Sequence, residues 1–151
     1  MTKNIKLLLQ QAMYQKIDVQ MQSLQAALKS IEESKQNETK SSAGDKYETG
    51  RAMMQMEQDK MNAQFSLLMA TKNHLQQISV DKESIQGEIG AIIGTEKENY
   101  YISVGLGKIE LDGQMYYTIS PEAPLSKLMI NKSIGDNVTF GNRSFEIFTI
   151  I

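Results

Sequence analysis

The chain has 151 residues, of which 40% are hydrophobic and 23% are charged, and its formal net charge is −2. This composition is typical of a globular chain and excludes a disordered one. The sequence contains no cysteine and one histidine, His74, which excludes disulfides and thiolate catalysis and argues against cysteine or histidine metal sites and Ser-His-Asp triads. Apolar runs are too short for a transmembrane helix or a secretory signal, so we expect a cytoplasmic protein with no membrane partner.

Charge is distributed unevenly between the two halves of the chain. Residues 1–79 contain ten Lys and Arg against eight Asp and Glu, whereas residues 80–151 contain six against ten. Neither half has the strongly basic surface that binding of free nucleic acid requires. If the function involves DNA or RNA, we expect another protein to hold it.

The first half carries two apolar stripes with helical spacing. The first stripe recurs at intervals of three and four residues: Ile5, Leu9, Met13, Ile17, Met21, Leu24, Leu28 and Ile31. The second has heptad spacing: Met54, Met61, Leu68 and Leu75, with Phe65 and Ile78 interleaved. Residues 33–49 between them are polar and rich in turn formers. These patterns predict two long helices that form an antiparallel coiled-coil hairpin over residues 1–79, with an acidic tip near residues 38–50.

From Val80 onwards the pattern becomes that of short strands. Five segments have β-rich composition: Ile89–Ile93, Tyr100–Val104, Met115–Ile119, Asn137–Phe140 and Ser144–Ile151. The pairs Asp112-Gly113 and Gly141-Asn142 are hairpin turn signals, and Leu125–Asn131 is a short helix candidate. We therefore expect an α+β chain, in which a small β-rich domain over residues 80–151 follows the helical hairpin.

Two segments resemble one known family. The predicted tip reads Gly44-Asp45-Lys46-Tyr47-Glu48, and a later segment reads Ala-Pro-Leu-Ser-Lys-Leu-Met-Ile-Asn-Lys from Ala123, followed by Gly135-Asp136-Asn137-Val138. In order and spacing they are similar to the tip motif Gly-Asp-x-x-Glu and the C-terminal segment of the Gre family of bacterial transcript cleavage factors. Ala123 stands where the family has serine, and Ser126 and Asn131 stand where it has glycine.

The resemblance implies a fold, a partner and a function. The fold is a coiled-coil hairpin followed by an FKBP-like domain, and the partner is RNA polymerase. The hairpin enters the secondary channel of the polymerase, where Asp45 and Glu48 help to hold a catalytic Mg²⁺ shared transiently with the polymerase. The chain is then an accessory factor that stimulates the polymerase's own cleavage of backtracked RNA. It meets the RNA 3′ end only inside the polymerase, and DNA only through it.

The chemistry of the two acidic residues agrees with this role but has a second explanation. Carboxylates are suitable ligands for Mg²⁺, and two residues three apart can share one side of a helical turn. However, Asp45 and Glu48 also have the spacing of an N-capping box, in which each side chain accepts a backbone N–H at the start of a helix. The two explanations are compatible for at least one of the pair.

The tip departs from the family after Glu48. Active members have Asn-Ala-Glu-Tyr there, whereas this chain has Thr49-Gly50-Arg51-Ala52. Arg51 brings positive charge beside the carboxylates, and it would pair with RNA phosphate or with acidic groups of the polymerase. Two alternative functions therefore stay open: a Gre-like regulator that occupies the channel without cleavage, and a coiled-coil interaction protein unrelated to polymerase.

Further partner-binding residues are expected in both halves. Tyr47 would stack on an RNA base or a polymerase element, or pack on the other helix of the hairpin. Pro124, Leu125 and Lys127 are candidates for a contact with the polymerase. We favour a place in the core of the small domain for Leu125 and Leu128.

Overall fold

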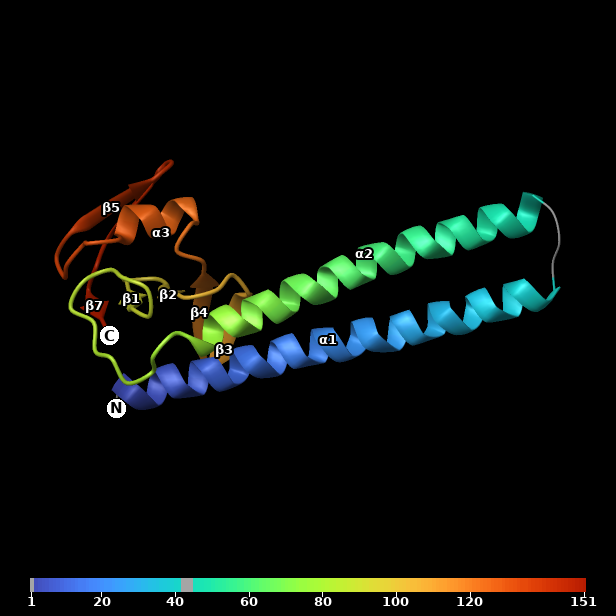
Figure 1. The fold of residues 1–151 in the computed structure, drawn as a ribbon. Helices are drawn as coiled ribbons and strands as arrows, with labels where there is room; N and C mark the ends of the chain where they lie inside the picture. Colours follow the sequence, from blue (N-terminus) through green and yellow to red (C-terminus); the bar gives the residue numbers. More distant parts are fainter. Residues whose placement is uncertain (1, 42–44) are drawn as a thin grey trace. The chain divides into compact units, whose positions relative to one another are not determined.

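The fold consists of two long helices and a small β domain (Figure 1). The computed structural model describes the backbone of residues 2–41 and 45–151 and the side chains of residues 5–37 and 48–151. The elements are α1 (Thr2–Ser41), α2 (Asp45–Gln76), β1 (Ile92–Gly94), β2 (Asn99–Ile102), β3 (Gly107–Leu111), β4 (Gln114–Ile119), α3 (Pro124–Met129), β5 (Asn137–Phe140), β6 (Arg143–Glu146) and β7 (Thr149–Ile150). The predicted α+β fold class is confirmed.

Two compact units are present, and each is described by itself. One comprises residues 15–72, and the other comprises residues 1–14 together with residues 73–151. The division at residue 79 stays a prediction. No helix among the residues that the structure describes is both long and apolar enough to cross a membrane.

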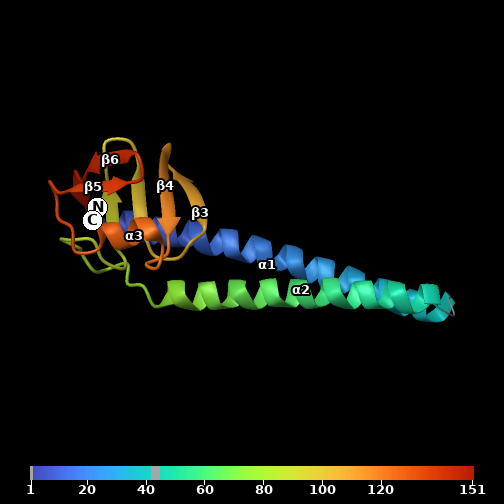
Figure 2. The same cartoon turned by 90° about the horizontal axis from the view of Figure 1, so that it is seen from above.

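In the helical unit, α1 and α2 run side by side in opposite directions, as Figures 1 and 2 show. Asp18 and Lys72 form an ion pair across the two helices, with 3.0 Å between Oδ1 and Nζ. The predicted apolar stripes lie between the helices: Ile17 is fully buried, and the other stripe residues of this unit are half-buried, namely Met21, Leu24, Leu28, Ile31, Met54, Met61, Phe65 and Leu68. Burial of these stripes is the main source of stability for such a pair of helices.

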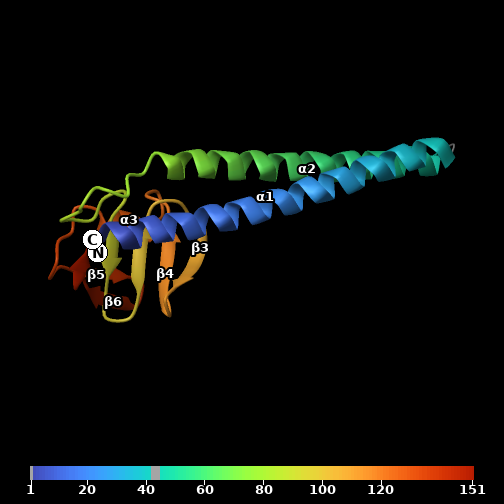
Figure 3. The same cartoon turned by 90° about the horizontal axis from the view of Figure 1, so that it is seen from below.

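The β unit is built on a five-stranded sheet with the strand order β3-β4-β2-β1-β7. β2 and β4 are parallel, and the remaining neighbours are antiparallel. Figure 3 shows α3 and the β5–β6 hairpin beside this sheet. Their buried side chains form one core with the sheet: Ala91, Ile93, Tyr100, Ile102, Met129, Val138 and Ile147. The first turns of α1 belong to the same unit, where Gln10 Nε2 donates to the Tyr101 hydroxyl at 3.2 Å.

Both predicted hairpin turns are present and follow from local backbone preferences. Asp112 and Gly113 have φ of 51° and 79°, which is the pair of positive angles that a type I′ turn requires. Gly141 alone has positive φ in the second turn, at 61°, as expected for a type II′ turn. These turns fix the register of β3 with β4 and of β5 with β6.

In the segment that resembles the C-terminal part of the Gre family, the local backbone conformation and hydrogen bonds account for several of the residue types. Asn131 has φ of 66°, a left-handed conformation that asparagine adopts more readily than most residues. Ser126 is fully buried, and its hydroxyl donates to the Ser120 carbonyl at 2.6 Å. Gly135 has φ of 94°, and the Asp136 carboxylate accepts the Ser133 N–H at 2.8 Å in the same turn. The two replaced glycine positions therefore hold residues that fit their local structure.

Two expectations for the β unit need correction. The predicted strand Ser144–Ile151 is two strands, because Ile147 is buried and bonds in both directions to the loop before β5: its N–H donates to Asp136, and its carbonyl accepts from Gly135. Leu128 was expected in the core but is 40% exposed. The buried face of α3 contains Ser126 and Met129, so Leu128 points away from it. Leu125 does pack against the core.

Candidate functional site

The first candidate site is the beginning of α2. This helix starts at Asp45, so Asp45 and Glu48 fall in its first turn. Glu48 is exposed, whereas the side chains of Asp45 and Tyr47 lie outside the described residues. The same holds for residues 42–44, which include Gly44 of the predicted motif. A helix N-terminus favours negative charge, so a capping role for these carboxylates agrees with their position.

The residues at this position fit a shared metal ion better than a resident one. An exposed carboxylate on a first helical turn offers the oxygen that Mg²⁺ prefers. However, no group of three or more Asp, Glu, His or Cys side chains within the described part of the chain is arranged to hold a metal ion. Two carboxylates leave most positions of an octahedral site open, so the remaining ligands would come from water and a partner.

The other predicted binding residues are accessible to different degrees. Arg51 lies on α2 about one helical turn after Glu48, and its side chain is exposed. Thr49, next to Glu48, is exposed as well. On α3, Pro124 and Lys127 are exposed, whereas Leu125 is half-buried against the core. Pro124 occupies the first turn of α3, where its missing N–H costs nothing.

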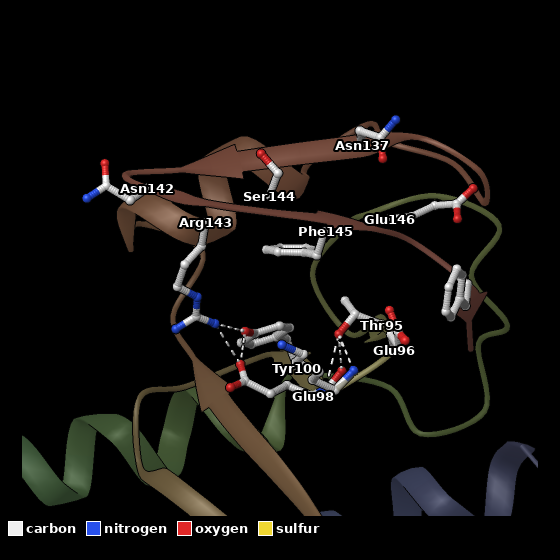
Figure 4. A pocket seen from close by; sticks show the side chains of 12 residues that line it. Thr95, Glu96, Glu98, Tyr100, Asn137, Asn142, Arg143, Ser144, Phe145 and Glu146 are labelled. Carbon is white, nitrogen blue, oxygen red and sulfur yellow. Dashed lines mark hydrogen bonds and ion pairs between the residues drawn. The ribbon is translucent and has the colours of Figure 1, made fainter.

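The second candidate site is a cleft in the β unit, which Figure 4 shows from close by. It has a volume of about 450 Å³ and lies between the β1–β2 turn and strand β6. The Phe145 ring stacks on the Tyr100 ring, with 5.9 Å between their centroids and 27° between their planes. Arg143 Nη2 lies 3.1 Å from Glu98 Oε2 and 3.4 Å from the Tyr100 hydroxyl, which itself donates to Glu98.

Burial and this polar cluster shift the ionisation of Tyr100. Burial of its ring is the main cause, and the adjacent Glu98 carboxylate adds to it, so the pKa of Tyr100 is raised to about 12. Glu98 also raises the pKa of Arg143. The phenol is therefore a neutral donor at physiological pH. The cleft offers an aromatic floor and one ion pair, a combination of apolar surface and few polar groups that is typical of ligand pockets.

Replacing Tyr100 with phenylalanine is expected to remove part of the alkaline sensitivity of the fold. Because the folded-state pKa lies above the ordinary value near 10, the neutral phenol stabilises the folded state fully below about pH 10 and loses this effect as pH rises through about 12. The free energy of unfolding between these pH values should fall more steeply for the wild type than for Tyr100→Phe. Phenolate absorbance during titration measures the pKa directly, and Glu98→Gln should lower it.

Sequence patterns did not point to this cleft. Glu98 and Arg143 are 45 positions apart, and neither belongs to a motif or a periodic stripe. Their proximity depends on the β5–β6 hairpin lying beside the sheet, which is a long-range arrangement. The one available signal was the aromatic content of the segments around Tyr100 and Phe145.

Several solved structures are similar to this chain, among them the following two. One is the GreA factor homolog 1 (Gfh1) of Thermus thermophilus, which is 15% identical over 91% of this chain and 94% of that chain, with a TM-score of 0.39. The other is described as the transcription factor Gfh1 and is 16% identical over 92% of this chain and 93% of that chain, with a TM-score of 0.40. No protein-family model and no curated protein matches the chain.

Proposed function

We propose that this chain is a Gre-like transcription factor that binds RNA polymerase in the cytoplasm and inserts its helical hairpin into the secondary channel. The observation that carries the proposal is that α2 begins at Asp45. The acidic pair of the motif therefore starts the second of two long antiparallel helices. A helix of 40 residues is about 60 Å long, so such a pair can present two carboxylates at the end of a narrow probe.

In this proposal Asp45 and Glu48 assist the catalytic centre of the polymerase. Mg²⁺ would supply Lewis-acid chemistry and an activated water for hydrolysis of the backtracked RNA. Asp45 would act as a direct ligand, and Glu48 as a second ligand or as the residue that holds the water. The polymerase would provide the remaining acidic ligands, so the chain is an accessory factor and has no activity alone.

The β unit would provide the contact that holds the factor on the polymerase. Pro124 and Lys127 are exposed on α3, and the Leu128 residue on the same short helix is 40% exposed. A proline, an aliphatic side chain and a lysine together can bury apolar area and pair with an acidic residue. Leu125 supports this surface from the core side. Tyr47 and Arg51 would contact the RNA 3′ end or the polymerase near the carboxylates.

The proposal is tested with stalled, backtracked elongation complexes that carry RNA labelled at its 3′ end. Addition of the full chain should release short 3′ fragments in the presence of Mg²⁺, and the remaining RNA should become extendable. Absence of release at every Mg²⁺ concentration would contradict cleavage stimulation.

A regulator that occupies the channel without cleavage is the second candidate, and the exposed Arg51 favours it. Arg51 stands where active members of the family have an acidic residue, and it lies close to both carboxylates in the sequence. This candidate predicts competition with an active cleavage factor and altered pausing, without RNA fragments. If the chain does not bind core polymerase at all, both candidates fail, and a coiled-coil interaction protein remains.

A further inference from the structure

A polar cluster joins the last third of α1 to the first half of α2. Lys35 is only 8% exposed, and its ammonium donates to Gln55 Oε1 at 2.7 Å and to Gln58 Oε1 at 3.0 Å. Gln58 Nε2 in turn donates to Glu32 Oε2 at 3.0 Å. We call these four residues, Glu32, Lys35, Gln55 and Gln58, the polar clasp. It links α1 to α2 through three hydrogen bonds between side chains.

Two residues of the polar clasp, Lys35 and Gln58, stand at positions in phase with the apolar stripes. Lys35 follows Ile31 by four residues, and Gln58 follows Met54 by four residues, so both lie on the faces that the helices turn toward each other. Beyond Ile31 the chain contains no Leu, Ile, Val, Met or Phe until Met53. Met53 itself is 67% exposed. We call residues 32–41 of α1 and 45–52 of α2 the distal ends of the helices. Neither distal end has a large aliphatic residue that could form a seam with the other.

We propose that the polar clasp holds the distal ends of α1 and α2 together, and that Lys35 is a positioning residue for Asp45 and Glu48. A buried ammonium costs free energy unless its donors are satisfied, so the contacts of Lys35 with Gln55 and Gln58 favour one alignment of the helices over others. A polar residue in a coiled-coil seam is known to specify register in this way, at some cost in stability.

The choice of amide partners suits an end that carries two carboxylates. Two contacts of Lys35 are to neutral glutamine side chains, and the carboxylates of Glu32 and Asp59 accept hydrogen bonds from those glutamines. An aliphatic seam here would expose apolar surface whenever the helix ends fray. The polar clasp stands on the contacts within the helical unit, whereas its role for Asp45 and Glu48 rests on the proposed function.

Distance measurements on the free, full-length protein test the polar clasp. The chain has no cysteine, so spin labels can be attached cleanly to a Gln36→Cys/Met53→Cys pair, whose two positions are exposed. The wild-type background should give one narrow distance distribution. In Lys35→Met, which keeps an unbranched side chain one atom shorter but removes its charge and donors, the distribution should broaden toward longer distances. Backbone amides of residues 33–37 and 53–57 should also exchange about tenfold faster.

Lys29→Met is the matched control, because Lys29 is an exposed lysine on the same helix, and it should leave both measurements unchanged. An unchanged distribution in Lys35→Met, or equal broadening in both variants, would overturn the proposal. The measurement involves no polymerase, so its result does not depend on the proposed function. If the wild type releases RNA fragments, Lys35→Met should release fewer while binding polymerase equally well, and equal release would overturn the positioning role alone.

Discussion

Replacing Gly87 with alanine is expected to destabilise the β unit by about 3 kcal/mol or more. A Cβ at this position would lie 1.8 Å from the carbonyl oxygen of Met129 and 2.7 Å from its carbonyl carbon. Both atoms belong to the backbone at the end of α3, so no side-chain rotation relieves the overlap. The Gly87 N–H donates to Lys132, and its carbonyl accepts from Asn131, each at 2.8 Å. Thermal unfolding monitored by circular dichroism measures the effect, which should lower the midpoint by about 10 °C or more.

Gly113→Ala provides the matched control for this substitution. Gly113 has φ of +79°, and a Cβ there would meet nothing within 4 Å. Its cost is therefore backbone strain alone, about 1 kcal/mol. Equal losses of stability in the two variants would show that the close approach of Gly87 to α3 is not what holds this part of the fold.

Neutralising the acidic pair with Asp45→Asn and Glu48→Gln should reduce release of RNA fragments by about 100-fold or more. The substitutions keep the size of each side chain and one acceptor oxygen, and asparagine is as good an N-cap as aspartate. A purely capping role therefore predicts normal activity, whereas a role in holding Mg²⁺ and water requires the two charges. Fragment release from backtracked complexes is the measurement, with helix content checked by circular dichroism.

The control for the acidic pair is Glu57→Gln. Glu57 is an exposed carboxylate on α2, three turns beyond the first one, and its loss should change neither cleavage nor binding. Binding of the double variant to core polymerase should also match the wild type. Full fragment release by the neutralised variant would assign Asp45 and Glu48 to helix capping.

Local patterns in the sequence were sufficient for most elements of the fold. The two apolar stripes predicted α1 and α2, because a period of three to four residues leaves few other ways to bury them. The Asp112-Gly113 turn was predictable because only a few residue types accept two successive positive φ angles. Strand β5 was predicted with the bounds that the structure has, Asn137–Phe140.

Arrangements that depend on long-range contacts were not predictable in this way. The break between β6 and β7 arises at Ile147, which bonds to residues on the loop before β5, and nothing in the local sequence marks it. The cleft around Tyr100 likewise needs residues from two distant segments. The polar clasp did have a signal: Lys35 and Gln58 continue the apolar stripes with polar residues. In the sequence of a single helix, each one has the appearance of an ordinary exposed residue.

The most direct test of the central claim is a photo-crosslink from the beginning of α2. A benzoylphenylalanine in place of Thr49, an exposed residue next to Glu48, reports which molecule lies beside the acidic pair when the factor is bound. In backtracked elongation complexes we expect adducts with the active-centre region of RNA polymerase and with the RNA 3′ end, and none when the secondary channel is filled by an active cleavage factor. A factor that binds polymerase but gives no adduct from this position, or gives adducts only at the outer surface, would contradict insertion of the hairpin.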